Sequence, residues 1–141
     1  MTGKTKASTG RSSTWWPDSL AEVARRARAG QQPFDPAVRE FLDHFYSTPK
    51  ARQAAIQDRP EPVGTVQDAY LAAVAEHLAL AYGLDVPAWT EEPGRSLKRP
   101  FFAGGLESLK ATLLVESPTA FRRRMIFISA NALSRPRQTI D

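Results

Sequence analysis

Apolar residues recur at helical spacing along much of the chain. Between residues 20 and 27, and again between residues 38 and 45, they stand at positions i, i+3, i+4 and i+7, which gives a helix one apolar face. Residues 65–82 are apolar almost all round, a pattern typical of a helix that is buried on several sides. Residues 106–117 place leucines along one face. The pattern therefore predicts a mostly α-helical fold.

Capping residues set the expected limits of the first two helices. Asp18 or Ser19 can cap the first helix, and Gly30 can end it in a left-handed turn. Asp35 is expected to cap the second helix, with Pro36 in its first turn, where a missing N–H has no cost. Shorter helices are expected at residues 50–59 and 119–125.

Similar signals delimit the later helices. Thr65 and Asp68 form a variant of the capping box, and Gly83 can end the long helix that follows. Ser117 is expected to cap a further short helix that starts at Pro118. Residues 126–129 form either a short strand or a continuation of this helix, because periodicity cannot separate the two over four residues.

Residues 84–105 contain prolines and glycines and show no period, which predicts a long loop. Trp89, Phe101 and Phe102 are expected to pin this loop to the core. We thus predict a mostly α, single compact helical domain over residues 15–135, with a long Pro/Gly-containing loop and room for one short strand near the C-terminus. Residues 1–14 are expected to be a disordered basic tail, and residues 136–141 a frayed end.

Charge is distributed unevenly along the 141 residues, whose formal net charge is +4. Residues 1–17 hold three bases and no acid, residues 18–94 hold seven bases and twelve acids, and residues 95–141 hold nine bases and three acids. An acidic middle between two basic ends favours a charged partner, although the regions can also neutralise one another within the fold.

Composition favours a cytoplasmic location. It contains no cysteine, so disulfides and thiolate metal sites are excluded. The N-terminus lacks the apolar core of a secretory signal, and no apolar run approaches the ~20 residues of a membrane span. We therefore expect a cytoplasmic protein without membrane contacts.

The two histidines, His44 and His77, are the candidate metal ligands. Asp43 and Glu76 are their neighbours, and Glu40 shares a helix face with His44, so two helices could bring these groups together. The spacing matches neither HExxH nor ExxH, and ordinary surface residues explain it equally well. We predict no metal site and no cofactor.

No motif of an enzyme is present. FFAGG at residues 101–105 precedes a helix but lacks the GxxxxGK spacing of a phosphate loop, so its glycines are expected to form a tight turn. A phosphate at the N-terminus of that helix remains an alternative. No serine lies in a GxSxG motif. We predict that the protein is not an enzyme.

Arg122, Arg123 and Arg124 run directly into the apolar block MIFI. On a helix, three successive side chains spread over about 200°, so they cannot all face one groove. At least one can reach a phosphate, and another can pair with a carboxylate of the acidic middle. The turn before them resembles that of a helix-turn-helix, but the second helix starts without polar base-reading residues.

Trp15 and Trp16 end the polar tail. Each indole has a large apolar area, so at least one is expected to anchor the tail to the domain. The alternative is that the pair belongs to a surface that binds a partner, because tryptophan and arginine are favoured interface anchors.

A family resemblance extends over residues 15–135. The runs WWPDSLAEVARRARAG, REFLDHFY, DAYLAAVAEHLALAYGLDVPAW and FFAGGLESLKATLLVESPTAFRRRMIFISANALSR resemble a group of small actinobacterial proteins encoded beside a toxin-like partner of the nucleotidyltransferase or PIN type. The resemblance implies an antitoxin, a protein that binds and neutralises a cognate toxin. It includes no residue-level motif for that contact.

Two functions are therefore expected. The first is an antitoxin-like interaction protein, for which the candidate partner-binding residues are Trp15, Trp16, Arg122, Arg123 and Arg124. The second is a nucleic-acid-binding transcriptional regulator that uses the basic C-terminal third. Its candidate residues are Arg122, Arg123, Arg124, Arg135 and Arg137.

Overall fold

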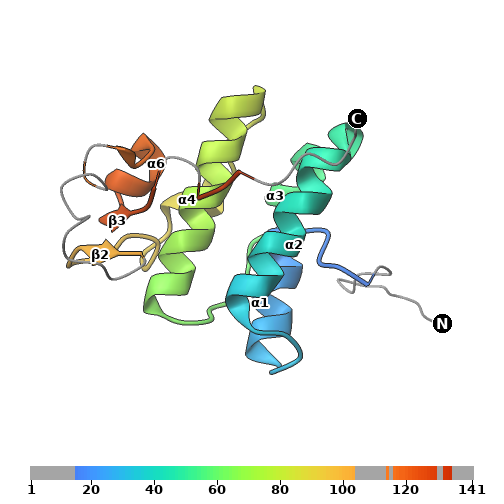
Figure 1. Ribbon diagram of the computed structural model, residues 1–141, viewed down its shortest axis with the longest axis horizontal. Helices are drawn as coiled ribbons and strands as arrows, with labels where there is room; N and C mark the ends of the chain where they lie inside the picture. Colours follow the sequence, from blue (N-terminus) through green and yellow to red (C-terminus); the bar gives the residue numbers. More distant parts are fainter. Residues whose placement is uncertain (1–14, 104–113, 115, 130–131, 135–141) are drawn as a thin grey trace. The chain divides into compact units, whose positions relative to one another are not determined.

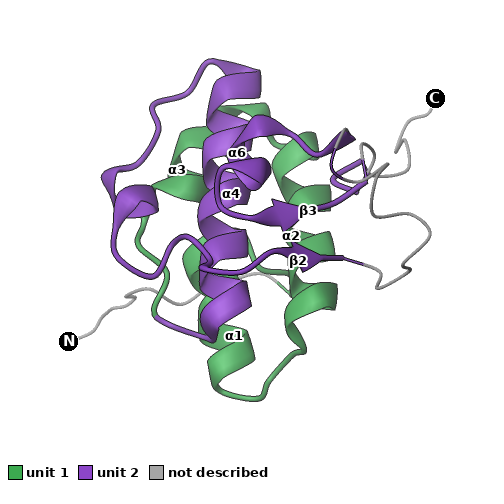
Figure 2. Ribbon diagram, turned by 90° about the vertical axis from the view of Figure 1, so that its left-hand side faces the viewer, with its two compact units in different colours: residues 1–61 green, residues 62–141 purple. Residues whose placement is uncertain are grey.

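The computed structural model describes residues 15–103, 114, 116–129 and 132–134. Within these residues it contains five α-helices, two short 3-10 helices and one two-stranded parallel sheet, so the predicted mostly helical fold is confirmed. The chain divides into two compact units, residues 1–61 and residues 62–141 (Figure 2). The limits of one domain over residues 15–135 stay a prediction. No helix of the described part has both the length and the apolar content of a bilayer span.

The first unit is a small helical assembly (Figure 1). It consists of α1 (Leu20–Arg28), α2 (Phe34–Ser47), the 3-10 helix η1 (Pro49–Ala51) and α3 (Arg52–Gln57). The helix α1 packs against α2 and α3. Its predicted apolar face is confirmed, because Leu20, Val23 and Ala24 are fully buried.

The predicted boundary signals of α1 are both confirmed. Ser19 caps α1, since its hydroxyl oxygen accepts a hydrogen bond from the Glu22 N–H at 3.0 Å. Gly30 follows α1 with a φ of 71°, the left-handed conformation that glycine adopts without strain. The predicted Asp35 cap is wrong, because α2 begins one residue earlier and Pro33 precedes it. Asp35 lies in the first turn instead, where its charge complements the helix dipole.

The second unit is built around one long helix, α4 (Thr65–Tyr82). It contacts the 3-10 helix η2 (Ala88–Glu91) and the short helix α6 (Thr119–Arg122). Most of its buried residues are alanines, and they lie on several faces of the helix, as predicted. The buried positions of α4 are Ala69, Leu71, Ala72, Ala73, Val74, Ala75, Leu78 and Ala79.

Only part of the predicted capping box of α4 is present. The Asp68 carboxylate accepts hydrogen bonds from the N–H groups of Val63 at 2.7 Å and Gly64 at 3.3 Å. The cap residue is Gly64, however, and Thr65 is the first helical residue. Gly83 ends α4 with a φ of 68°, as predicted.

Two short strands complete the second unit. The strand β3 (Ile126–Phe127) lies where the sequence left open a strand or a continued helix, and it pairs in parallel with β2 (Phe101–Phe102). The register places Phe101 opposite Ile126 and Phe102 opposite Phe127, and the rings of Phe102 and Phe127 stack at 5.0 Å. The strand β2 arises from the segment predicted as loop, because pairing with a distant strand leaves no local signal.

The loop before β2 is anchored as expected at Trp89, which is buried, whereas Phe101 is 38% exposed. Ser117 does not cap α6. Its hydroxyl donates to the Ile128 carbonyl at 2.9 Å and accepts from the Ile128 N–H at 2.8 Å, so it joins α6 to the end of β3. The predicted helix over residues 106–117 and both chain ends fall largely outside the described residues.

Candidate functional site

Trp15 combines a fixed backbone with an exposed indole. Its carbonyl oxygen accepts a hydrogen bond from Arg26 Nη1 at 2.9 Å, and Arg26 is itself 5% exposed on α1. The indole side chain is nevertheless 93% exposed. Because a large apolar ring in water is unfavourable, a tryptophan presented in this way is a typical anchor for a protein partner.

The next residue, Trp16, is held by a hydrogen bond of its own side chain. Its indole N–H donates a hydrogen bond to His44 Nδ1 at 2.9 Å, and the two rings lie 6.3 Å apart. Trp16 still leaves 42% of its surface exposed. The expectation that one indole anchors the chain is met by Trp16, while Trp15 is left facing solvent. The His44 Nδ1 is the acceptor of this hydrogen bond.

A buried carboxylate holds the arginine that fixes Trp15. Glu22 is buried and accepts hydrogen bonds from Arg26 Nε at 2.8 Å and from Arg25 Nε at 2.8 Å. Burial alone would raise the pKa of Glu22, but the hydrogen bonds and charges of Arg25 and Arg26 outweigh it and lower the pKa. The carboxylate therefore stays ionised, and Arg26 keeps its orientation toward Trp15.

The arginine run of the second unit is mostly engaged inside the fold. Arg124 is 1% exposed. Its Nη1 donates to the Ala120 carbonyl at 2.9 Å and also to the Glu76 carboxylate, and its Nη2 donates to the Thr90 carbonyl at 3.1 Å and to Glu91 at 3.3 Å. One guanidinium thus joins α4, η2 and α6.

Arg123 joins the same carboxylates from the outside. Its Nε donates to Glu76 at 3.0 Å, and its Nη2 donates to Glu91. Burial alone would raise the pKa of Glu76, but the hydrogen bonds from Arg124 and Arg123 outweigh it and lower the pKa. The pairing of an arginine with a carboxylate of the acidic middle, which the sequence predicted, is therefore present twice.

Arg122 differs from its two neighbours. It is exposed and meets only the Thr119 hydroxyl, at 3.3 Å, among the contacts of the described residues. The chain changes direction after Arg124, because Met125 adopts a φ of 67°, a left-handed conformation that is uncommon for a residue with a side chain. The Met125 carbonyl then accepts from the Phe101 N–H at 2.9 Å. This turn separates the buried Arg124 from the strand that follows.

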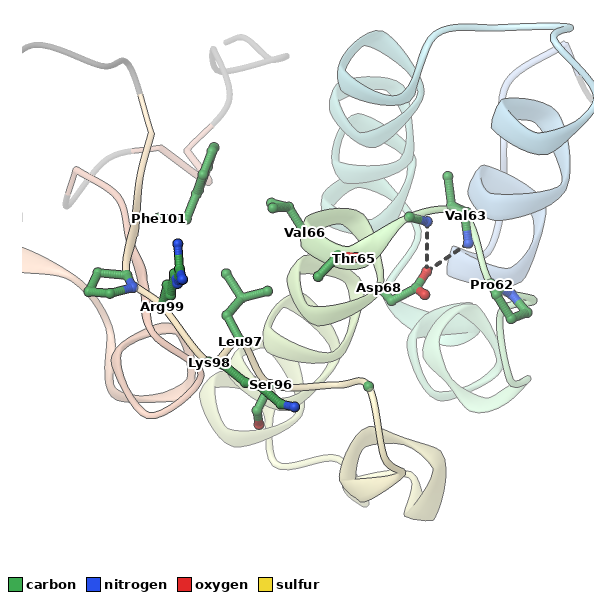
Figure 3. Close-up of a pocket in the computed structure, with 13 residues that line it drawn as sticks. Pro62, Val63, Thr65, Val66, Asp68, Ser96, Leu97, Lys98, Arg99 and Phe101 are labelled. Atoms are coloured by element: carbon green, nitrogen blue, oxygen red, sulfur yellow. Dashed lines mark hydrogen bonds between the residues drawn. The ribbon is translucent and has the colours of Figure 1, made fainter.

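A groove with a volume of about 870 Å³ lies beside the N-terminal end of α4 (Figure 3). Residues 62–66 and 68 form one wall, and residues 94 and 96–101 form the other. In Figure 3, Val66 points from the first turn of α4 toward the wall that holds Arg99 and Phe101, and Leu97 projects into the space between them. The groove therefore combines apolar side chains with basic ones.

The sequence identified some of these residues and missed others. Trp15, Trp16 and the three successive arginines were singled out, whereas Arg135 and Arg137 fall outside the described residues. Glu22 and Arg26 were missed as a site, although their i, i+4 spacing is a visible signal of a helix pair. Glu91 and the groove had no such signal, because their partners are distant in the chain.

Neither metal binding nor relatedness to a known protein adds to this description. Within the described ranges, no group of three or more histidine, cysteine, aspartate or glutamate side chains is placed to hold a metal ion. His77 contacts the ring of Phe121 edge-on instead. Comparison with family models, with curated proteins and with solved structures finds no match.

Proposed function

We propose that the protein is an antitoxin-like interaction protein that binds a cognate toxin through a surface that includes Trp15 and Trp16. The single observation that carries the proposal is the 93% exposed indole of Trp15 on a backbone held by buried Arg26. Holding the backbone before binding lowers the entropy that an interface must overcome, and an indole contributes a large apolar contact.

The arginine cluster supports the same choice. Two of the five candidate nucleic-acid-binding residues, Arg123 and Arg124, already bind Glu76 and Glu91. A phosphate would have to displace these carboxylates, which favours a protein partner over a nucleic acid. The identity of that partner as a toxin rests on the family resemblance alone.

Co-expression with the product of the adjacent gene tests the proposal. We expect that product to inhibit growth alone, and the two proteins to co-purify and restore growth together. Trp15→Ala should weaken the complex by about thirtyfold or more, since an anchor residue contributes ~2 kcal/mol or more. Leu80→Ala is a matched control, because Leu80 is an exposed apolar residue of the second unit, and it should have little effect.

Two results would reject the proposal. One is a neighbouring product that is harmless alone or does not co-purify with this protein. The other is a complex that Trp15→Ala and Leu80→Ala leave equally strong, which would move the contact away from the tryptophan pair.

A further inference from the structure

Hydrogen bonds hold the two walls of the groove at the N-terminal end of α4 together. Arg95 is 4% exposed, and its Nη1 donates to the Asp68 carbonyl at 3.2 Å, so the second wall is bonded to the first turn of α4. The Arg95 guanidinium also lies over the Trp89 ring at 4.8 Å. In the middle of the second wall, the Leu97 N–H donates to the Arg124 carbonyl at 3.1 Å. The groove is therefore formed before any ligand arrives.

The charged groups of the groove are unbalanced. Lys98 and Arg99 are exposed on one wall, and neither takes part in an ion pair among the residues that the structure describes. Asp68, the acid on the opposite wall, already accepts hydrogen bonds from the Val63 and Gly64 N–H groups. The groove thus presents two cations whose charge the facing carboxylate does not neutralise through a direct contact.

The apolar groups of the groove are also accessible. Val63, Val66 and Leu97 are partly exposed, and Phe101 is 38% exposed at its end. A volume of about 870 Å³ accommodates several side chains of a bound segment. An occupant that fits must therefore supply both negative charge and apolar surface.

We propose that this groove binds an extended, acidic segment of a partner protein that places an aliphatic or aromatic side chain between Val66 and Leu97. Its carboxylates would lie against Lys98 and Arg99, and the charge complementarity would set its direction. A nucleic-acid strand fits less well, because two cations contact few phosphates and the apolar wall offers nothing to a sugar–phosphate backbone. The inference adds a second binding surface and does not rest on the tryptophan pair.

Titration of the full chain with labelled peptides of about eight residues tests the groove. The probes are an array of peptides that combine aspartate or glutamate with leucine or phenylalanine. Each peptide has two control peptides. One has serine in place of the apolar residues, and the other has lysine in place of the acidic residues. A single-stranded oligonucleotide of similar length is the third comparison. We expect the acidic, apolar peptides alone to bind, with amide NMR shifts at Val66, Leu97 and Phe101.

A charge-reversal pair identifies the cations. Lys98→Glu with Arg99→Glu should weaken peptide binding by about tenfold or more, because two favourable charge contacts become repulsive. Arg39→Glu with Lys50→Glu makes the same charge change at exposed positions of the first unit and should change binding less than about twofold. Equal unfolding midpoints for both variants show that neither charge reversal destabilises the fold.

The proposal is overturned by any of three results. The first is that no peptide binds more tightly than its serine control. The second is that the two charge-reversal variants lose equal peptide affinity. The third is that the oligonucleotide binds as tightly as the best peptide. Because Trp15 is unchanged throughout, toxin binding can fail while the groove succeeds, or the reverse.

Discussion

Each unit contains a buried arginine shared between a glutamate and backbone carbonyl groups, but the two arrangements bridge different lengths of chain. In residues 1–61, Arg26 pairs with Glu22 one turn away on the same helix. In residues 62–141, Arg124 pairs with Glu76, which lies 48 positions earlier on α4. The first pair depends on one helix, whereas the second exists only after the end of α6 has packed against α4.

The difference explains what each arginine does. The Nε of Arg26 donates to a glutamate on its own helix, and its Nη1 donates to the Trp15 carbonyl, while the Trp15 indole stays exposed. The Nη1 and Nη2 atoms of Arg124 donate to carbonyl and carboxylate groups of α6, η2 and α4, so Arg124 acts as a bridge inside the fold. A buried arginine thus presents a surface in one unit and holds secondary structure together in the other.

Removing the long-range bridge should have the largest effect. Arg124→Ala is expected to lower the free energy of unfolding by about 3–5 kcal/mol, because the carbonyl groups of Ala120 and Thr90 lose a buried donor and the half-buried Glu76 carboxylate keeps only Arg123. Urea denaturation of the two proteins measures the loss. Arg123→Ala, whose side chain is 40% exposed, is the control and should cost less than ~1 kcal/mol. Equal losses of unfolding free energy in the two variants would contradict the role of Arg124 as the bridge between α4, η2 and α6.

Removing the local bridge should cost less. Arg26→Ala is expected to lower the free energy of unfolding by about 2–3 kcal/mol, because Glu22 and the Trp15 carbonyl lose a buried partner. The backbone amide of Trp15 should also become mobile, which ¹⁵N relaxation detects. Arg25→Ala, whose side chain is 39% exposed and pairs with the same glutamate, should leave Trp15 ordered. An ordered Trp15 in the Arg26 variant would show that other contacts hold it.

His77, in the second unit, should make the stability of the protein depend on pH. Burial lowers the pKa of His77 below its usual 6.5, so the folded protein favours the neutral imidazole. The unfolded chain therefore binds more protons than the folded protein in the pH window between the folded-state pKa of His77 and 6.5. The stability that His77 contributes is present above this pH and is lost as the pH falls through the folded-state pKa. His77→Gln should flatten the dependence in this window and run parallel to the wild type above pH 7, as measured by denaturation.

The smallest effect is expected for binding to DNA. Since Arg123 and Arg124 are paired with carboxylates, Arg122 is the member of the run left to meet a phosphate. A plot of log affinity against log salt for duplex DNA should then have a slope of about −1 or shallower, which Arg122→Ala brings toward zero. Fluorescence anisotropy measures it. A slope of about −3 that disappears only in the triple Arg122, Arg123 and Arg124 alanine variant would restore the regulator hypothesis.

Local patterns predicted the helices of this protein well. The apolar spacing located α1, α2 and α4, and Gly30 and Gly83 marked two helix ends because glycine alone enters the left-handed region at no steric cost. Cap assignments were less successful. Asp35 has a suitable side chain, but α2 begins at Phe34, and the Ser117 hydroxyl bonds to the distant Ile128 backbone instead.

The candidate sites divide in the same way. The chain itself determined that Trp15 and Trp16 end the polar tail, that Glu22 and Arg26 share a helix face, and that three arginines precede an apolar run, since these features depend on neighbours in sequence. Only the tertiary structure decided that the Trp15 indole is exposed, that Arg124 is buried against Glu76, and that residues 62–68 and 94–101 enclose a groove. These outcomes depend on contacts between residues tens of positions apart, and such contacts form only once the chain has paid the entropy of closing the loops between them.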